Sequence, residues 1–181
     1  MAEAVVVPLK RFGVAKGRLR KAPNLDAAAI AEELARGVIA SSAPRHVIVL
    51  SEDRGVTAFA LSLGAEVRES GAMSLNEAVA GAYQELRHRF NRLIIAHGDL
   101  AQPAGLGTFE PGAGITLFAD RHGMGTNVTV LPTGLDFRFG FGPGSLRRHV
   151  AEAERLKVEF RVIVDSPWRF DVDEPGDLEA R

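Results

Sequence analysis

Cysteine is missing from the 181-residue sequence. Its absence excludes disulfide bonds, thiolate catalysis and cysteine-bound metals, and leaves oxygen-ligated hard cations as the metals to consider. A charge excess of one sign is missing too, because 22 Lys and Arg residues stand against 23 Asp and Glu residues. Proteins that bind nucleic acid or membrane surfaces usually carry a clear basic excess, so we expect neither partner and look for local anion sites.

Long hydrophobic runs are also missing. No apolar stretch is long enough to span a bilayer. The amino terminus, Met-Ala-Glu-Ala followed by a short apolar run, lacks the basic head and long apolar body of a signal peptide. We therefore expect a cytoplasmic protein. The length and even composition predict a single domain over residues 1–181 with a full hydrophobic core.

The most informative stretch is residues 93–100, Leu-Ile-Ile-Ala-His-Gly-Asp-Leu. Its aliphatic run without alternation predicts a strand buried on both faces that ends shortly before Asp99. Ligands bind at the carboxyl ends of strands in open α/β sheets, so Asp99 is a candidate ligand for a divalent cation held against phosphate oxygens. The alternative is an aspartate that caps the next turn.

A basic loop follows a first predicted strand at residues 5–8. Glycines at positions 13 and 17 would let its backbone curl around a ligand. The position after a first buried strand suits a triphosphate, although neither the Walker nor the Rossmann glycine pattern is present, and a solvated basic turn is the alternative. The basic residues of this loop are Lys10, Arg11, Lys16, Arg18, Arg20 and Lys21.

A second candidate anion site lies at residues 139–149, Phe-Gly-Phe-Gly-Pro-Gly-Ser-Leu-Arg-Arg-His. The glycine-rich part leads through Ser145 into a predicted helix that ends near Lys157. Backbone N–H groups at the positive end of a helix, with arginines one turn on, favour an anion cradle. An ordinary loop with a serine cap is the alternative.

Two alternate carboxylates, Asp171 and Asp173, precede a short predicted terminal helix. Alternate residues of an extended segment face the same way, so either can complete a metal site begun by Asp99. Capping of the terminal helix is the alternative. Asn76, in the first turn of another predicted helix, can reach a nucleobase edge or help to cap that helix.

The remaining periodicity predicts three further helices and five further strands. Ser74 and Glu77 have capping-box spacing. His122 is assigned no catalytic role, because a turn histidine without an evident partner is usually exposed. We expect helices near 26–42, 53–64 and 74–90, strands near 46–50, 66–69, 114–119, 128–131 and 158–164, and a loop over 100–114.

Several separated segments together resemble one family, the 2-phospho-L-lactate guanylyltransferases and their phosphoenolpyruvate-using relatives in coenzyme F-420 biosynthesis. The resemblance runs from end to end, and the Phe-Gly-Pro-Gly-Ser segment with the Gly-Thr-Asn turn is specific to this family. Near the amino terminus, residues 7–10 resemble the family pattern Pro-Val-Lys and residues 16–19 resemble Lys-Ser-Arg-Leu. The other segments, each with the family pattern it resembles in parentheses, are 97–100 (Gly/Ala-Asp-Leu-Pro), 120–127 (Asp-x-x-Gly-x-Gly-Thr-Asn), 141–149 (Phe-Gly-Pro-Gly-Ser-Phe-x-Arg-His) and 171–178 (Asp-Val-Asp-Thr-Pro-Glu-Asp-Leu).

The resemblance implies an α/β fold of the glycosyltransferase-A-like, Rossmann-like type, with three α/β/α layers and a mixed, mostly parallel sheet. It also implies transfer of GMP from GTP to the phosphate of a three-carbon acid, with release of pyrophosphate. Asp99, Asp173 and Lys16 would be catalytic, and the first two would bind magnesium. The substrate positions it implies are Leu9, Lys10, Lys16, Arg18 and Asn76 for GTP, and Thr126, Gly142 and Ser145 for the phosphorylated acid.

This chain departs from the family pattern at two positions and in one segment. Ala101 replaces the usual proline, Glu174 replaces a common threonine, and residues 101–112 look too short and glycine-rich for the helix expected there. Two other hypotheses therefore stay open: a nucleotidyltransferase of the same fold with another nucleotide or acceptor, such as a molybdopterin-type enzyme, and a non-catalytic GTP-binding module. The choice among phosphoenolpyruvate, 2-phospho-L-lactate and 3-phosphoglycerate stays open too, as does the oligomeric state.

Overall fold

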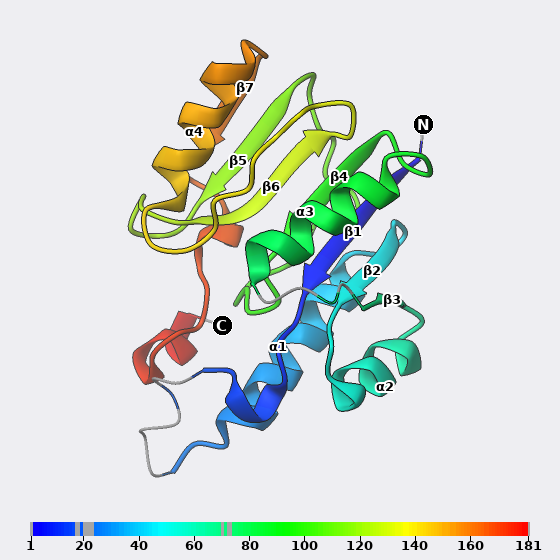
Figure 1. The fold of residues 1–181 in the computed structure, drawn as a ribbon. Helices are drawn as coiled ribbons and strands as arrows, with labels where there is room; N and C mark the ends of the chain where they lie inside the picture. Colours follow the sequence, from blue (N-terminus) through cyan, green and yellow to red (C-terminus); the bar gives the residue numbers. More distant parts are fainter. Residues whose placement is uncertain (1, 17–18, 20–23, 70, 72–73, 181) are drawn as a thin grey trace.

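The computed structural model describes residues 2–16, 19, 24–69, 71 and 74–180. Strands and helices alternate over most of the chain (Figure 1). The elements are β1 (Glu3–Pro8), η1 (Phe12–Val14), α1 (Ala27–Ser41), β2 (His46–Leu50), α2 (Arg54–Ser62), β3 (Glu66–Arg68), α3 (Leu75–Leu86), β4 (Arg92–Ala96), β5 (Ile115–Ala119), β6 (Thr126–Pro132), α4 (Ser145–Leu156), β7 (Phe160–Ile163), η3 (Pro167–Arg169) and η4 (Pro175–Ala180), where η marks a 3-10 helix.

Seven strands form one sheet in the order β3-β2-β1-β4-β6-β5-β7. Only β6 runs against its neighbours, since it pairs antiparallel with both β4 and β5. This confirms the mixed, mostly parallel sheet. The chain leaves β1 through α1 to β2 on one side, and β4 later pairs on the other side of β1. Ligands in open α/β sheets bind at such a switch point, outside the carboxyl ends of the strands.

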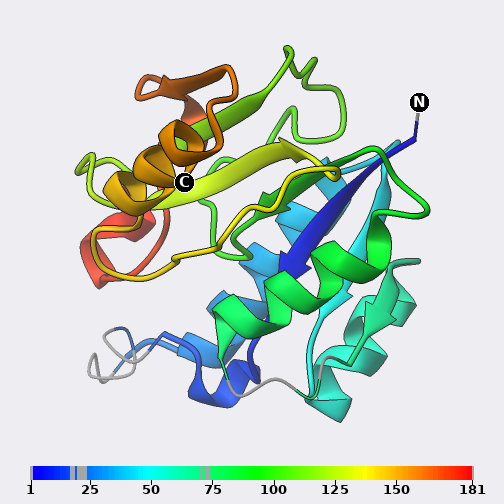
Figure 2. The same ribbon diagram turned by 45° about the horizontal axis from the view of Figure 1, so that its top comes forward.

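Helices cover both faces of the sheet. Alternate side chains of β1 divide between two cores: Val6 packs in the cluster with α3 and α4, and Val5 in the cluster with α1 and α2. Ile95 and Ile94 of β4 divide in the same way. Figure 2 shows α3 and α4 together on one side of the sheet. The three-layer prediction is therefore confirmed.

Local signals in the sequence account for the helix starts. Asp26 caps α1 by accepting the N–H groups of Ala28 and Ala29 at 3.1 and 3.0 Å. Ser74 and Glu77 form the expected capping box at the start of α3, with distances of 3.2 and 3.0 Å. The capping chemistry thus fixes where these helices begin.

Several boundaries differ from the expectation: α3 ends at Leu86 rather than near residue 90, and β7 covers only Phe160–Ile163. Two further differences matter for the site. β6 begins at Thr126, before the expected residue 128, because pairing with β5 extends into the polar turn. The N-cap of α4 is Gly144 at a φ of 73°, a left-handed conformation that suits glycine. Ser145 is therefore the first helical residue rather than the cap. Its hydroxyl oxygen accepts the backbone N–H of Thr126 instead of capping the helix.

The segment after β4 is irregular from residue 101 to residue 114, as expected for its glycine content. The loop packs under the sheet through Leu106, which is fully buried. No helix in the described part of the chain has the length and apolar character needed to cross a membrane.

Candidate active site

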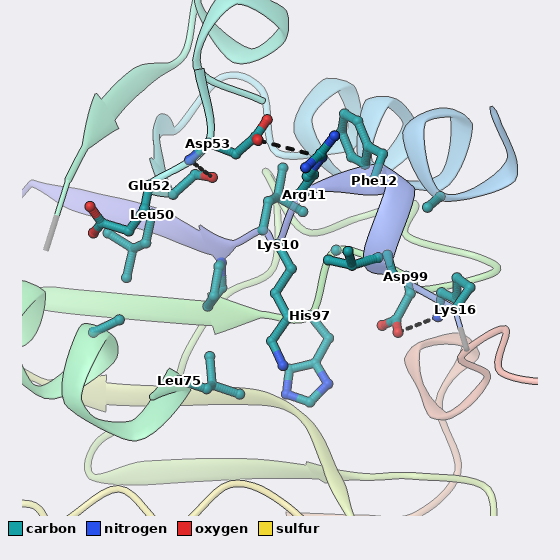
Figure 3. Close-up of a pocket in the computed structure, with 18 of the residues that line it drawn as sticks. Lys10, Arg11, Phe12, Lys16, Leu50, Glu52, Asp53, Leu75, His97 and Asp99 are labelled. Atoms are coloured by element: carbon teal, nitrogen blue, oxygen red, sulfur yellow. Dashed lines mark hydrogen bonds and ion pairs between the residues drawn. The ribbon is translucent and has the colours of Figure 1, made fainter. Parts of the chain in front are cut away.

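A cavity of about 1090 Å³ opens at the carboxyl ends of β1, β2 and β4 (Figure 3). The loop after β1, the end of β2, the start of α3 and the loop after β4 all line it. Five of the predicted site residues meet there: Leu9, Lys10, Lys16, Asp99 and Asp173. Arg18, the further residue expected to bind phosphate, lies outside the described residues.

Three carboxylates gather at one side of this cavity. Asp99, Asp171 and Asp173 each offer an oxygen, and these oxygens all lie within 4.8 Å of one another. A short antiparallel bridge between Leu100 and Asp171 brings the segments together. Its hydrogen bonds include one from the Val172 N–H to the Asp99 carbonyl, at 3.0 Å. Backbone pairing therefore places the carboxyl-terminal acids beside the strand-end acid.

The cluster fits a divalent cation. Within the described part of the chain, Oδ1 of Asp99 is buried without a hydrogen-bond partner. Buried polar atoms normally have a partner, and a bound ion would supply one here. Carboxylate oxygens are the donors that hard divalent cations prefer. Burial, together with the charges of Asp99 and Asp173, raises the pKa of Asp171. The cluster therefore concentrates negative charge that a cation would neutralise.

Lys16 inserts its ammonium group into this cluster. Nζ lies 2.5 Å from Oδ2 of Asp99 and 3.4 Å from Oδ1 of Asp173, and only 6% of the Lys16 side chain is exposed. Burial alone would raise the pKa of Asp99, but the charges of Lys16 and His97 and the hydrogen bond from Lys16 together outweigh it, and the net pKa is lowered. The Lys16 backbone has a φ of 57°, a costly conformation for a residue with a side chain.

The opposite part of the cavity carries other polar groups. Figure 3 shows Lys10 extending across the cavity toward the imidazole of His97, while Glu52 and Asp53 lie apart from Asp99. Asn76 does not line the cavity. Its side chain pairs with the backbone of Phe141, accepting the N–H at 2.7 Å and donating to the carbonyl at 3.3 Å. Asn76 thus anchors the glycine-rich loop to α3.

The residues expected to hold the acid come together next to that loop. Oγ of Ser145 accepts the backbone N–H of Thr126 at 2.9 Å, and both residues are buried. Gly142 has a φ of 113°, which favours glycine. The Phe141 ring links this group to the cavity, because its centroid lies 5.4 Å from that of His97.

Arg148 stabilises the conformation of the glycine-rich loop. Its guanidinium donates to the carbonyl oxygens of Gly140 and Pro143 at 2.9 and 2.8 Å. The arginines after Ser145 were expected to support an anion cradle. For Arg148 the contribution is to the shape of the loop, since its donors are used on backbone carbonyls.

Three residues at the site were not found from the sequence. His97 lines the cavity and His149 is fully buried behind the glycine-rich loop. Asp177 accepts the backbone N–H groups of Asp173 and Glu174, both at 2.8 Å, and pairs with a neighbouring arginine. All three residues lie inside the motifs quoted above, which could have indicated them. The sequence does not indicate that Asp177 pairs with a distant arginine.

Comparisons with known proteins identify the family of this chain. Residues 3–180 match the family model described as "Guanylyl transferase CofC like". A phosphoenolpyruvate guanylyltransferase of Sphaerobacter thermophilus is 33% identical over 190 residues, covering 99% of this chain and 92% of the relative. A 2-phospho-L-lactate guanylyltransferase of Methanothermobacter thermautotrophicus is 29% identical over 191 residues, covering 98% and 83%.

Solved structures with much lower identity share the fold. A nucleotidyl transferase from Methanothermobacter superposes with a TM-score of 0.63 at 15% identity, covering 98% of this chain and 94% of the other. A CMP:2-keto-3-deoxy-manno-octonic acid synthetase complexed with CTP gives 0.61 at 12% identity, covering 99% and 96%. The fold is therefore that of nucleotidyltransferases, and the family match over almost the whole chain shows that the protein belongs to the CofC-like guanylyl transferases.

Proposed function

We propose that this protein transfers GMP from GTP to the phosphate of a phosphorylated three-carbon acid, phosphoenolpyruvate or 2-phospho-L-lactate, and releases pyrophosphate, as a step of coenzyme F-420 biosynthesis. The observation that carries the proposal is the juxtaposition of the Asp99, Asp171 and Asp173 carboxylates with Lys16 in a cavity at the switch point of the sheet. The printed names of the curated relatives support the choice of nucleotide and acceptor.

The reaction needs little covalent help from the protein. An oxygen of the acceptor phosphate, already anionic at neutral pH, attacks the α-phosphorus of GTP, and the bond to the departing pyrophosphate breaks. No general base is required, so rate enhancement comes from alignment and from neutralisation of charge. Lys10 and Lys16 reach the same cavity as the acidic cluster and supply positive charge to the triphosphate.

Asp99 and Asp173, with Asp171 beside them, would hold the magnesium ion. When bound, the ion neutralises charge on the phosphate oxygens. The carboxylates would exchange the Lys16 ammonium for the ion, and the ammonium would then be able to turn to a phosphate. Leu9 and Lys10 follow β1 directly, and we assign them with Arg18 to the nucleotide. Asn76, expected at the nucleotide, instead holds the backbone of Phe141 in the glycine-rich loop. Thr126, Gly142 and Ser145 are assigned to the acid.

Pyrophosphate release is the direct test of this function. The purified chain is incubated with magnesium, GTP and, in turn, phosphoenolpyruvate, 2-phospho-L-lactate or 3-phosphoglycerate, with ATP and CTP as control nucleotides. Release with GTP and one acid supports the proposal and identifies the acceptor. Release with another nucleotide points to a different nucleotidyltransferase, and tight GTP binding without release with any acid points to a binding module.

A further inference from the structure

His149 lies behind the proposed acid site with both ring nitrogens engaged. Its side chain is fully buried. Nε2 lies 3.0 Å from the backbone nitrogen of Gly140, and Nδ1 lies 3.1 Å from Oγ1 of Thr126. The rings of Phe137 and Phe141 pack against the imidazole, with centroids 5.7 and 4.8 Å away. The orientation of the imidazole is therefore fixed from several sides.

The neighbours of this imidazole determine its tautomer. A backbone N–H can only donate, so Nε2 of His149 must accept from Gly140 and carries no proton. The proton of the neutral ring then sits on Nδ1 and is donated to Oγ1 of Thr126. Burial, helped by the positive charge of Arg148, lowers the pKa of His149 to about 4, which agrees with a neutral ring at neutral pH.

The hydrogen bond from His149 leaves the Thr126 hydroxyl proton to be donated elsewhere. Ser145 is in a comparable position, because its Oγ accepts the backbone N–H of Thr126 at 2.9 Å. Two adjacent hydroxyls thus act as acceptors toward the protein while retaining a proton each. Donors of this kind suit an anionic ligand such as a carboxylate or phosphate.

We propose that His149 is a positioning residue for the acid substrate, and this inference rests on the proposed function. Through Nδ1 it orients the Thr126 hydroxyl as a donor, and through Nε2 it holds the backbone of Gly140 at the start of the glycine-rich loop. It does not line the nucleotide cavity. Its loss should therefore weaken binding of the acid and leave binding of GTP unchanged.

The tautomer can be tested without any turnover. A long-range ¹H–¹⁵N correlation spectrum of the labelled full-length protein at neutral pH distinguishes protonated from unprotonated ring nitrogens. The signals of His149 are assigned by their loss in His149→Phe. A protonated Nδ1 with an unprotonated Nε2 supports the inference. The opposite tautomer, or a doubly protonated ring, overturns it.

Kinetics of matched variants test the positioning role. His149→Phe keeps the ring volume but removes both hydrogen bonds, and we expect the KM for the acid to rise about tenfold with the Kd for GTP unchanged. His149→Asn retains a donor near Nδ1 and should recover much of the loss, whereas His149→Gln, with its amide near Nε2, should not. His88→Asn, on an exposed histidine, is the control.

A double-mutant cycle with Thr126→Val completes the test. If His149 acts largely through Thr126, adding His149→Phe to Thr126→Val raises the KM for the acid by a smaller factor than adding it to the wild type does. Additive losses, or equal losses in GTP and acid binding, overturn the inference while wild-type turnover upholds the proposed function. Absence of turnover in the wild type with every acid overturns the proposed function and this role with it.

Discussion

The ammonium of Lys16 lies 2.5 Å from the carboxylate of Asp99, although 83 residues separate them in the sequence. It also contacts Asp173, so one cationic side chain joins two of the three acids that fit a metal ion. A lysine that neutralises the cluster when no metal is bound keeps the like charges from repelling one another. A cation bound by these carboxylates would take the place of the ammonium, which would then be able to contact the triphosphate.

Replacing Asp99 should abolish most of the activity. Asp99→Ala removes the buried oxygen that has no partner in the described part of the chain. We expect turnover to fall by about 10²- to 10⁴-fold, because several kcal/mol of charge stabilisation in the transition state are lost. Steady-state pyrophosphate release measures this, with Asp165→Ala as control because the side chain of Asp165 is 99% exposed. Wild-type turnover in a folded Asp99→Ala protein would contradict the metal assignment.

Replacing Lys16 should separate metal binding from catalysis. Lys16→Met removes the cation that competes for Asp99 and Asp173, so Mn²⁺ should bind the nucleotide-free protein severalfold more tightly. Turnover should fall at the same time, since the triphosphate loses a positive charge. Calorimetric titration with Mn²⁺ and a pyrophosphate assay measure the two effects. Weaker Mn²⁺ binding in this variant would show that Lys16 supports the metal site rather than competing with metal.

Stability should depend on pH through His149. Its folded pKa of about 4 lies below the ordinary histidine pKa of 6.5, so the unfolded chain binds more protons between these values. The free energy of unfolding should therefore fall as the pH drops from about 6.5 to about 4, by on the order of 3 kcal/mol in total. Urea denaturation across this range is the measurement. His149→Phe should show a shallower slope, and an unchanged slope would contradict the assignment.

Asp177 should affect metal binding through the backbone that carries Asp173. It accepts the N–H groups of Asp173 and Glu174 and pairs with Arg121, and its pKa is lowered because those contacts outweigh the effect of burial. Asp177→Asn keeps the shape but weakens these charge-assisted bonds by about 1 to 3 kcal/mol. We expect weaker Mn²⁺ binding, measured by titration. Metal affinity equal to that of the wild type would show that the segment is held by other contacts.

A side chain at Gly98 should displace Leu9. A Cβ there would lie 2.2 Å from Cδ2 of Leu9, a residue that lines the cavity. Gly98→Ala should displace Leu9, raise the KM for GTP and lower the free energy of unfolding by about 1 to 3 kcal/mol. Gly81→Ala is the matched control, since a Cβ at this position in α3 has no neighbour within 4 Å and alanine favours a helix. Equal GTP kinetics in both variants would contradict the close approach.

Local chemistry made much of the fold predictable. The helix starts at Asp26 and Ser74 follow from capping interactions within a few residues, and the buried strand before Asp99 follows from an unbroken aliphatic run. Thr126 was placed in a turn rather than in β6, because its polar neighbours predict a turn, whereas pairing with Ala119 of β5 extends the strand to it. The short 3-10 helices η1 and η3 were not anticipated.

The sequence by itself determined the elements, the absence of thiol chemistry and, through its motifs, the family. Hydrophobic periodicity and capping are local properties, so they can be recognised in the order of residues. Only the tertiary structure decided that Leu100 pairs with Asp171, that Lys16 fills the acidic cluster and that His149 holds Thr126. These contacts join residues 23 to 83 positions apart, and their geometry depends on how the sheet and its loops pack.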